Sequence, residues 1–213
     1  MIVTGITEMS KTRCKVEIDY QFAFVLYKGE LRLYQIREGE EITAEDYHNI
    51  MEVLLPKRAR VRAMNLLKSK EYTTSQLRAK LKQSLYPEHI IEDALSYVAS
   101  FHYTDDLRYA VDYITSHEDI RSHRRINQDL QQKGIAQDIL RQAWQTWETN
   151  GGRQDEQQMI RILLEKKHYN AANATSKDRQ RIYAFLLRKG YSPSMINKAL
   201  GEYMDLYEHT PEI

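Results

Sequence analysis

The sequence has one cysteine and no long apolar run, and both absences limit what the protein can be. A single thiol, Cys14, excludes an intramolecular disulfide framework of the kind that stabilises small secreted proteins. The longest strongly apolar run, FAFVLY at 22–27, is far too short to cross a bilayer. No basic stretch followed by an apolar run opens the chain, so we expect a cytoplasmic protein.

Catalytic motifs are also missing. The chain contains no GxxxxGK[ST], HExxH, paired CxxC or GxSxG pattern, and its seven histidines are scattered. The densest group of possible metal ligands is His117, Glu118, Asp119 and His123, which straddles an expected helix end and helix start. Solvated polar residues are usual there, so we predict neither a metal site nor a cofactor, and no enzyme.

Charge is abundant but nearly balanced. Charged residues make up 29% of the chain and the formal net charge is only +1, so composition alone does not indicate a nucleic-acid binder. The distribution is uneven, because residues 57–213 carry 25 basic against 20 acidic side chains. This larger part of the chain is mildly basic.

The main pattern is an internal repeat of six apolar positions that occurs three times at constant internal spacing. The copies are Leu77, Leu81, Ile90, Ile91, Ala94 and Leu95; Ile126, Leu130, Ile139, Leu140, Ala143 and Trp144; and Ile182, Leu186, Met195, Ile196, Ala199 and Leu200. Within each copy the spacing is helical on both sides of a short turn, and a further helical segment precedes it. Each copy therefore predicts a three-helix unit.

The turns within the units differ in one residue. Gly134 and Gly190 occupy the second and third turns, where a left-handed residue ends a helix at little cost. Leu85 takes this place in the first turn, so we expect that turn to be distorted. Between the second and third units, Asn150-Gly151-Gly152 is the clearest candidate hinge.

The N-terminal part differs in kind from the repeats. Residues 13–36 are rich in Val, Ile, Phe and Tyr and predict strands, with a turn at 28–30 before a strand at 31–36, and an edge strand at 2–6. Thr43 followed by Asp46 predicts the start of a helix that covers them and ends at Pro56.

The predicted fold is therefore mainly α: tandem three-helix, helix-turn-helix-like repeats in an extended curved array, preceded by a small module that contains a β-hairpin. The expected domains are 1–56 for the N-terminal strand and helix module, 57–103, 104–150 and 151–213 for the repeats, with a frayed tail at 208–213. Such arrays offer long binding surfaces and seldom build deep pockets.

Two helix faces are candidate interaction surfaces. The third helices carry acidic residues such as Glu88, Glu92 and Asp93, which would repel phosphate and disfavour the reading of DNA bases. The second helices carry basic residues that could contact phosphates or an acidic protein surface, or form an ordinary solvated face. The candidates are Arg124 and Arg125, followed by Lys133, Arg78, Lys82, Arg181 and Arg188. In the structural alternative, one of the adjacent arginines pairs with Asp129.

Two stretches resemble the RecX family of bacterial regulators of the RecA recombinase. FHYTDDLRYA at 101–110 is similar to the family's GYLDDxRYA, with His102 and Thr104 replacing Gly and Leu, and SHRRINQDLQQKGI at 122–135 is similar to PRRIxxELxxKGI. FAFVLYKGEL at 22–31 also resembles the N-terminal part of longer members. Leu85 and the long loop at 170–177 depart from the family pattern.

The resemblance implies a non-enzymatic regulator that binds the RecA nucleoprotein filament and limits filament growth, ATP hydrolysis and strand exchange in DNA repair and recombination. It implies RecA as the protein partner, leaves direct binding of single- or double-stranded DNA open, and suits a monomer. We also expect Asp105 and Asp106 to cap the helix that follows Thr104. The alternatives are a nucleic-acid-binding helical repeat protein that follows a phosphate backbone without reading bases, and a helical scaffold for another protein.

Overall fold

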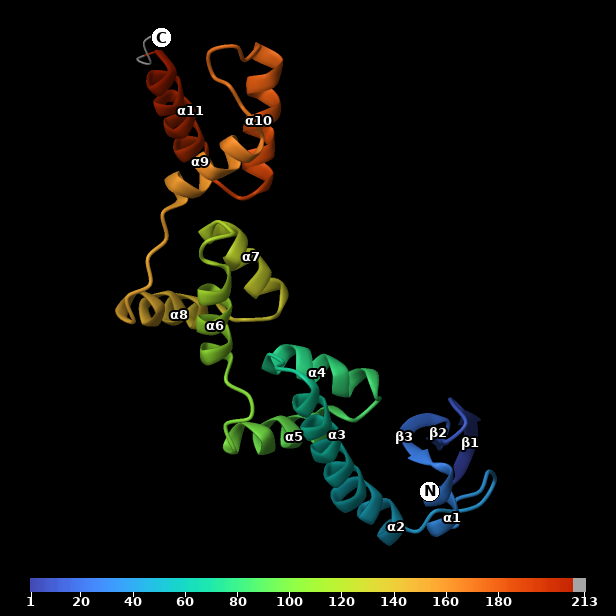
Figure 1. Ribbon diagram of the computed structural model, residues 1–213. Helices are drawn as coiled ribbons and strands as arrows, with labels where there is room; N and C mark the ends of the chain where they lie inside the picture. The colour runs from blue at the N-terminus through green and yellow to red at the C-terminus, as the bar shows by residue number, and fades with distance from the viewer. Residues whose placement is uncertain (209–213) are drawn as a thin grey trace. The chain divides into compact units, whose positions relative to one another are not determined.

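The computed structural model describes residues 1–208 and divides into two compact units, 1–105 and 106–213. The frayed tail predicted at 208–213 falls, apart from Glu208, outside the described residues. Figure 1 labels the elements: β1 (Val3–Glu8), β2 (Arg13–Ile18), β3 (Gln21–Tyr27), α1 (Lys28–Leu33), α2 (Ala44–Asn49), the π-helical segment η1 (Ile50–Leu54), α3 (Leu55–Ser69), α4 (Thr74–Gln83), α5 (Glu88–Ser100), α6 (Asp106–His117), α7 (His123–Gln132), α8 (Gln137–Thr149), α9 (Glu156–Lys166), α10 (Ser176–Arg188) and α11 (Pro193–Glu208). A mainly helical protein with tandem three-helix repeats is confirmed.

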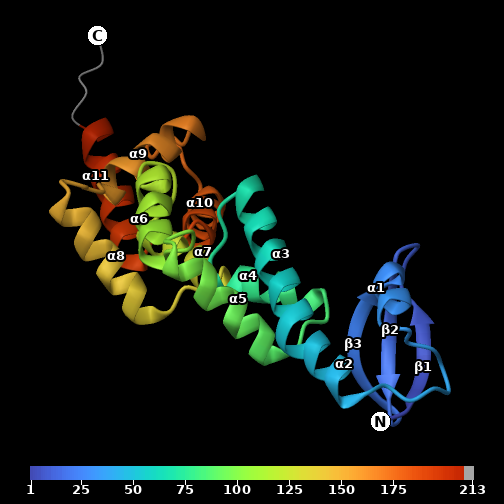
Figure 2. The same ribbon diagram turned by 90° about the horizontal axis from the view of Figure 1, so that it is seen from below.

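The first unit begins with an antiparallel sheet in the order β1-β2-β3, visible edge to edge in Figure 2. Cys14, Val16 and Ile18 of β2 alternate with partly exposed residues, as a half-covered strand requires. Val16 and Phe24 belong to a hydrophobic core that continues through α3 to α5. The sheet therefore shares its core with the first three-helix repeat.

The predicted strand at 31–36 is wrong, because residues 28–33 form α1. Glu30 accepts a hydrogen bond from the Tyr27 backbone N–H, at 2.7 Å between Tyr27 N and Glu30 Oε2. The same carboxylate pairs with Arg58, with 2.7 Å between Arg58 Nη1 and Glu30 Oε2. This long-range ion pair fixes the residue at the helix start and overrides the strand preference of the local sequence.

The helix that begins after Thr43 does not end at Pro56. Thr43 caps it as predicted, accepting a hydrogen bond from the Asp46 N–H at 3.0 Å. The helical run then passes through η1, where the Leu55 N–H bonds to the Ile50 carbonyl five residues back, and continues as α3 (Figure 1). The wider π turn gives the proline ring room beside the preceding turn, so Pro56 stands at the start of α3 without breaking the chain's helical course.

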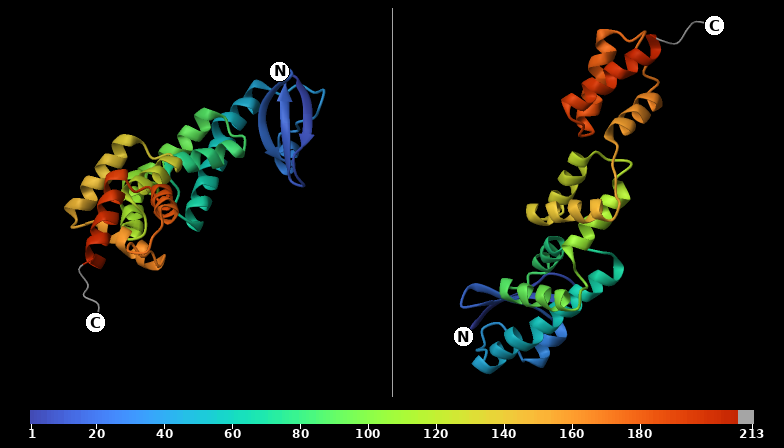
Figure 3. Two further views of the ribbon diagram at one scale, coloured as in Figure 1. Left: turned by 90° about the horizontal axis from the view of Figure 1, so that it is seen from above. Right: turned by 90° about the vertical axis from the view of Figure 1, so that its left-hand side faces the viewer.

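The three repeats consist of α3–α5, α6–α8 and α9–α11, the last of which is distinct in orange and red in Figure 3. Within the second unit, the repeats have separate hydrophobic cores, one around Ile126 and Trp144 and one around Leu186 and Ile196. The repeated apolar positions of α4, α7 and α10 are buried, each in the core of its own repeat: Leu77, Leu81, Ile126, Leu130, Ile182 and Leu186.

The first turn is not distorted relative to the others. Leu85 has φ +62°, close to the +84° of Gly134 and the +96° of Gly190. The first repeat thus makes the same left-handed turn with a leucine, at a conformational cost that the two glycines avoid.

The predicted hinge at 150–152 is held in place by its neighbours. A Cβ on Gly152 would lie only 2.2 Å from Trp147 Cε2, so the backbone passes directly over the indole. Two residues on, Gln154 Nε2 donates to the carbonyls of Glu118 and Arg121 at 2.7 and 2.8 Å. This segment is anchored to the second repeat.

Candidate interaction surface on the second helices

The second helix of the first repeat, α4, carries one paired and one unpaired cation of interest. The Arg78 guanidinium contacts two carboxylates of α5, with 2.9 Å between Nη1 and Glu88 Oε1 and 3.0 Å between Nη2 and Glu92 Oε2. Lys82 is exposed and has no ion pair within residues 1–201, whose side chains the structure describes. Arg78 therefore joins two helices, whereas Lys82 is open to a partner.

Acidic residues of α5 are largely occupied inside the repeat. Besides the two glutamates that hold Arg78, Asp93 receives a bidentate contact from Arg60 of α3, with N–O distances of 2.8 and 2.7 Å. The hydrogen bonds from Arg60 lower the pKa of Asp93 and raise that of Arg60. These acids have structural roles, which agrees with the argument against DNA reading by the third helices.

In the second repeat, Asp129 of α7 collects two arginines and a tyrosine. Arg125 Nε lies 3.2 Å from Asp129 Oδ1, and Arg121 contacts Oδ2 of the same carboxylate while donating to the Tyr113 hydroxyl at 2.6 Å. Only 8% of the Asp129 side chain is exposed. Burial, followed by the charge of Asp129, raises the pKa of Tyr113. The pairing of Arg125 with Asp129 is the structural alternative that the sequence offered.

Arg124 behaves differently from its neighbour. It is exposed on the first turn of α7 and has no ion pair in the part of the chain with described side chains. The helix start beneath it is fixed by Ser122, whose hydroxyl accepts from the Arg125 N–H and donates to the Lys189 carbonyl at 2.8 Å. A rigid helix end thus presents an unpaired guanidinium.

The remaining candidates are spread over the second unit. Lys133 Nζ lies 5.4 Å from the centroid of the Tyr113 ring, a cation–π contact. Arg181 is 70% exposed and reaches Asp178 only at 3.9 Å. Arg188, at the end of α10, is exposed and without an ion pair among the residues with described side chains.

A pocket of about 450 Å³ lies where the second and third repeats meet. Its walls are Ile120, Arg121, Arg125, Phe185, Arg188, Lys189 and Tyr191. Burial raises the pKa of Tyr191 to about 12, with a smaller contribution from Glu156. Four cations therefore converge on one concave surface made by both repeats.

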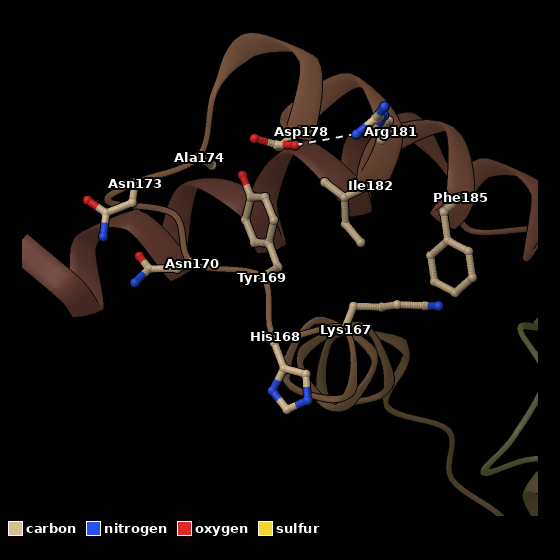
Figure 4. A pocket seen from close by; sticks show the side chains of 10 residues that line it. All are labelled: Lys167, His168, Tyr169, Asn170, Asn173, Ala174, Asp178, Arg181, Ile182 and Phe185. Carbon is tan, nitrogen blue, oxygen red and sulfur yellow. Dashed lines mark ion pairs between the residues drawn. The ribbon is translucent and has the colours of Figure 1, made fainter.

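A second pocket, of about 470 Å³, lies within the third repeat, beside its long loop. Figure 4 shows Tyr169 and Phe185 on opposite sides of the opening, with Lys167 beside the Phe185 ring and Asn170 and Asn173 on the loop. Lys167 Nζ is 5.1 Å from the centroid of that ring. Cations and aromatic rings line this pocket, and no pair of side chains here forms a nucleophile–base arrangement among the residues drawn.

Three of the four polar residues that could bind a metal by sequence have other partners. His117 stacks on Tyr113, Glu118 accepts from the Trp147 indole N–H, and His123 stacks on Trp144. Among the described residues, no three His, Cys, Asp or Glu side chains are grouped to hold a metal ion. Nor is any helix in that part of the protein long and apolar enough to span a membrane.

Comparison with known proteins finds family models and relatives that match this chain. Two family models match, the third three-helix domain of RecX at 154–200 and the first three-helix domain of RecX at 59–97. "Regulatory protein RecX" of Vibrio parahaemolyticus is 31% identical over 141 residues, which cover 65% of this chain and 87% of that protein. The chain belongs to the RecX family. "Regulatory protein RecX" of Caldanaerobacter subterraneus subsp. tengcongensis is 28% identical over 203 residues, 94% of this chain and 99% of the relative.

Solved RecX structures share the fold. A "Crystal structure of regulatory protein RecX" has a TM-score of 0.59 at 22% identity, and the match covers 92% of this chain and 97% of that chain.

The RecX-like motif at 101–110 lies at the start of the second repeat, where Ala110 is fully buried and Tyr109 packs against the core. α6 begins at Asp106, which agrees with the expected start of a helix, while a capping role of Asp105 and Asp106 stays a prediction.

Sequence reasoning missed Arg121 as a site residue, and it counted Lys189 among the basic residues of the second helices without making it a candidate contact. Arg121 lies in the loop before α7 and meets Asp129 eight positions away, outside the spacing at which helix neighbours pair. Lys189 enters the pocket only because the third repeat packs on the second. For Lys189 the repeat offered a clue, because this lysine directly precedes the turn glycine Gly190 just as Lys133 precedes Gly134.

Proposed function

We propose that this member of the RecX family is a non-enzymatic regulator that binds the RecA nucleoprotein filament and limits its growth, ATP hydrolysis and strand exchange. The observation that carries the proposal is membership of the family, supported by relatives that cover nearly the whole chain. Regulators of this kind need a surface for a polymer and no reaction centre.

Exposed cations of the second helices supply the contact. Arg124, Lys82 and Arg188 are exposed and unpaired in the part of the protein with described side chains, so no internal ion pair has to break when they meet an anionic partner. Arg78 and Arg125 have carboxylate partners and contribute mainly to folding. Lys133 and Arg181 are secondary contacts.

Inhibition follows if the bound protein favours one filament state. A ligand shifts an equilibrium only by its difference in affinity for the two states, so the regulator must bind the arrested filament more tightly than the growing one. We expect it to act as a cytoplasmic monomer, with any contact to DNA phosphates adding to the contact with RecA.

Fluorescence anisotropy at physiological salt tests this proposal. The labelled protein is titrated with RecA-coated single-stranded DNA, bare single-stranded DNA and bare duplex. Preference for the RecA-coated strand supports the proposed function. Equal binding to all three supports the alternative, a nucleic-acid-binding repeat protein, and binding to none supports a scaffold for another partner.

A further inference from the structure

The pocket between the second and third repeats has a charge surplus that the fold itself does not use. Arg121, Arg125, Arg188 and Lys189 line it, together with the apolar or aromatic side chains of Ile120, Phe185 and Tyr191. Among the described residues that line the pocket, none carries a carboxylate. Asp129 lies behind the two arginines of the second repeat, and Glu156, which acts on Tyr191, accepts a hydrogen bond from the His123 N–H at 2.6 Å.

We propose that this pocket receives an acidic side chain, Asp or Glu, of a protein partner. The inference rests on the proposed function in that the RecA filament is the partner against which it is tested. Even with Asp129 counted against the four cations, the site keeps a positive surplus in a concave setting, where water screens charges less than on an open face.

The two arginines of the second repeat are held ready for a second carboxylate. Asp129 fixes one edge of each guanidinium, at 3.2 Å from Arg125 Nε and in direct contact with Arg121. A guanidinium has five N–H donors, so each arginine keeps donors for another acceptor. Little conformational freedom remains to be lost when a ligand binds.

The third repeat adds the exposed cations Arg188 and Lys189 to the same pocket. The Ser122 hydroxyl donates to the Lys189 carbonyl at 2.8 Å, and a Cβ on Gly190 would lie 2.4 Å from Ser122 Oγ. This close approach holds the two repeats together at the pocket. Arg188 has no ion pair there within the described side chains, so it is free to complete the site.

The walls favour a side-chain carboxylate over a phosphodiester. Ile120, 68% exposed at the rim, and the ring of Phe185 can pack against the aliphatic stem of a glutamate. A phosphodiester is linked to sugar on both sides and lies more easily on open faces such as those of Arg124 and Lys82. Arginine binds both carboxylates and phosphates in a bidentate manner, so the apolar walls, and not the cations, make this distinction.

Charge reversal in the pocket tests the inference. Arg188→Glu removes a lining cation that has no structural ion pair, and Arg179→Glu, on the exposed face of the same helix, is the matched control. We expect Arg188→Glu to weaken binding to RecA-coated single-stranded DNA about tenfold or more, with Arg179→Glu near wild type. On bare single-stranded DNA, the two variants should behave alike.

Several results would overturn it. Equal weakening by both reversals would show a general charge effect, and a selective loss by Arg188→Glu on bare DNA would make the ligand a phosphate. If Arg188→Glu fails to fold by thermal melting, Arg188→Gln replaces it, and wild-type binding by that variant counts against the pocket. If the wild-type protein does not bind RecA-coated DNA, the proposed function fails as well; if it does and the Arg188 variants match it, only the pocket inference fails.

Discussion

The second and third repeats have chemically different side chains, one acidic and one aromatic, at equivalent positions of their second helices. Three residues after the first repeated apolar position of the second helix, the second repeat has Asp129 and the third has Phe185. Asp129 is nearly buried and gathers Arg121, Arg125 and Tyr113. Phe185 is partly buried, and the ammonium groups of Lys167 and Lys189 lie 5.1 and 5.8 Å from its ring centroid.

The difference shows that equivalent positions of two repeats can both bind cationic side chains although the charges in the two sequences are not repeated. In both repeats the position attracts cations, through a carboxylate in one and through the ring face in the other. Because the two repeats meet at the turn around Gly190, Arg121 and Arg125 of the second repeat and Lys189 of the third border one pocket. The equivalent residue of the first repeat, Lys80, is exposed and offers no such centre.

Removing the carboxylate should have the largest effect. Asp129→Ala would leave Arg121 and Arg125 without their shared partner and leave a void beside the Tyr113 hydroxyl. We expect a loss of about 2.5 kcal/mol in the free energy of unfolding, less than for a fully buried pair because both arginines are partly exposed. Urea unfolding measures it, and Asp138→Ala, an exposed carboxylate on α8, is the control. A change below that of the control would mean that the cluster does not stabilise the fold.

Separating the two repeats should have the next largest effect. Gly190→Ala adds a Cβ that would lie 2.4 Å from Ser122 Oγ and 3.3 Å from the Arg125 N, at φ +96°. Gly39→Ala is the control, because its φ of +83° is similar but nothing lies within 4 Å of the added Cβ. This variant therefore has only the cost of a left-handed backbone at a non-glycine residue. We expect the first change to lower stability by about 2 kcal/mol and the second by about 1 kcal/mol. Equal losses would contradict a close contact between the repeats.

A smaller effect depends on pH. Burial of one ring face against Trp144 lowers the pKa of His123 from its ordinary value near 6.5, while Glu156 of the third repeat and Glu148 oppose the shift. The unfolded chain therefore takes up the proton at higher pH than the folded one, and stability falls as the pH drops through the ordinary value. Thermal melting between about pH 7.5 and about pH 5.5 should show a shallower slope for His123→Phe than for wild type. His89→Gln, at an exposed position on α5, should keep the wild-type slope.

The smallest change extends the comparison to the first repeat. Leu85 makes the left-handed turn that Gly134 and Gly190 make in the other repeats. Leu85→Gly should raise stability by about 0.5 kcal/mol, because the relief of strain is partly offset by the greater freedom of glycine in the unfolded chain. A lower melting temperature would mean that contacts of the partly exposed leucine outweigh the strain.

The repeats could be predicted because their information is local. Apolar residues at helical spacing and caps such as Thr73, with its reciprocal hydrogen bonds to Gln76, act within one or two turns. The strand predicted at 31–36 failed because Glu30 is held by Arg58, which is 28 positions away. The helix end predicted at Pro56 failed because nothing local signals the π turn of η1.

The candidate site likewise contains local contacts that the sequence could predict and contacts between distant residues that it could not. The pairing of Arg125 with Asp129 follows from a spacing of four residues on one helix, so the sequence could offer it. The contact of Arg121 with Asp129 crosses a turn, and the approach of Arg188 and Lys189 depends on how one repeat packs on the next. The spacing thus favours Arg124 as the unpaired arginine, whereas the meeting of four cations at one pocket was visible only in three dimensions.

The most direct test of this account separates those two arginines. Arg124→Ala and Arg125→Ala are each assayed for inhibition of RecA ATP hydrolysis on single-stranded DNA and for thermal melting on the same preparation. We predict that Arg124→Ala keeps the wild-type melting temperature and needs about five times more protein for half inhibition, a factor that corresponds to about 1 kcal/mol, whereas Arg125→Ala melts at lower temperature. Wild-type inhibition by a well-folded Arg124→Ala protein would contradict the claim that the unpaired cations of the second helices engage the filament.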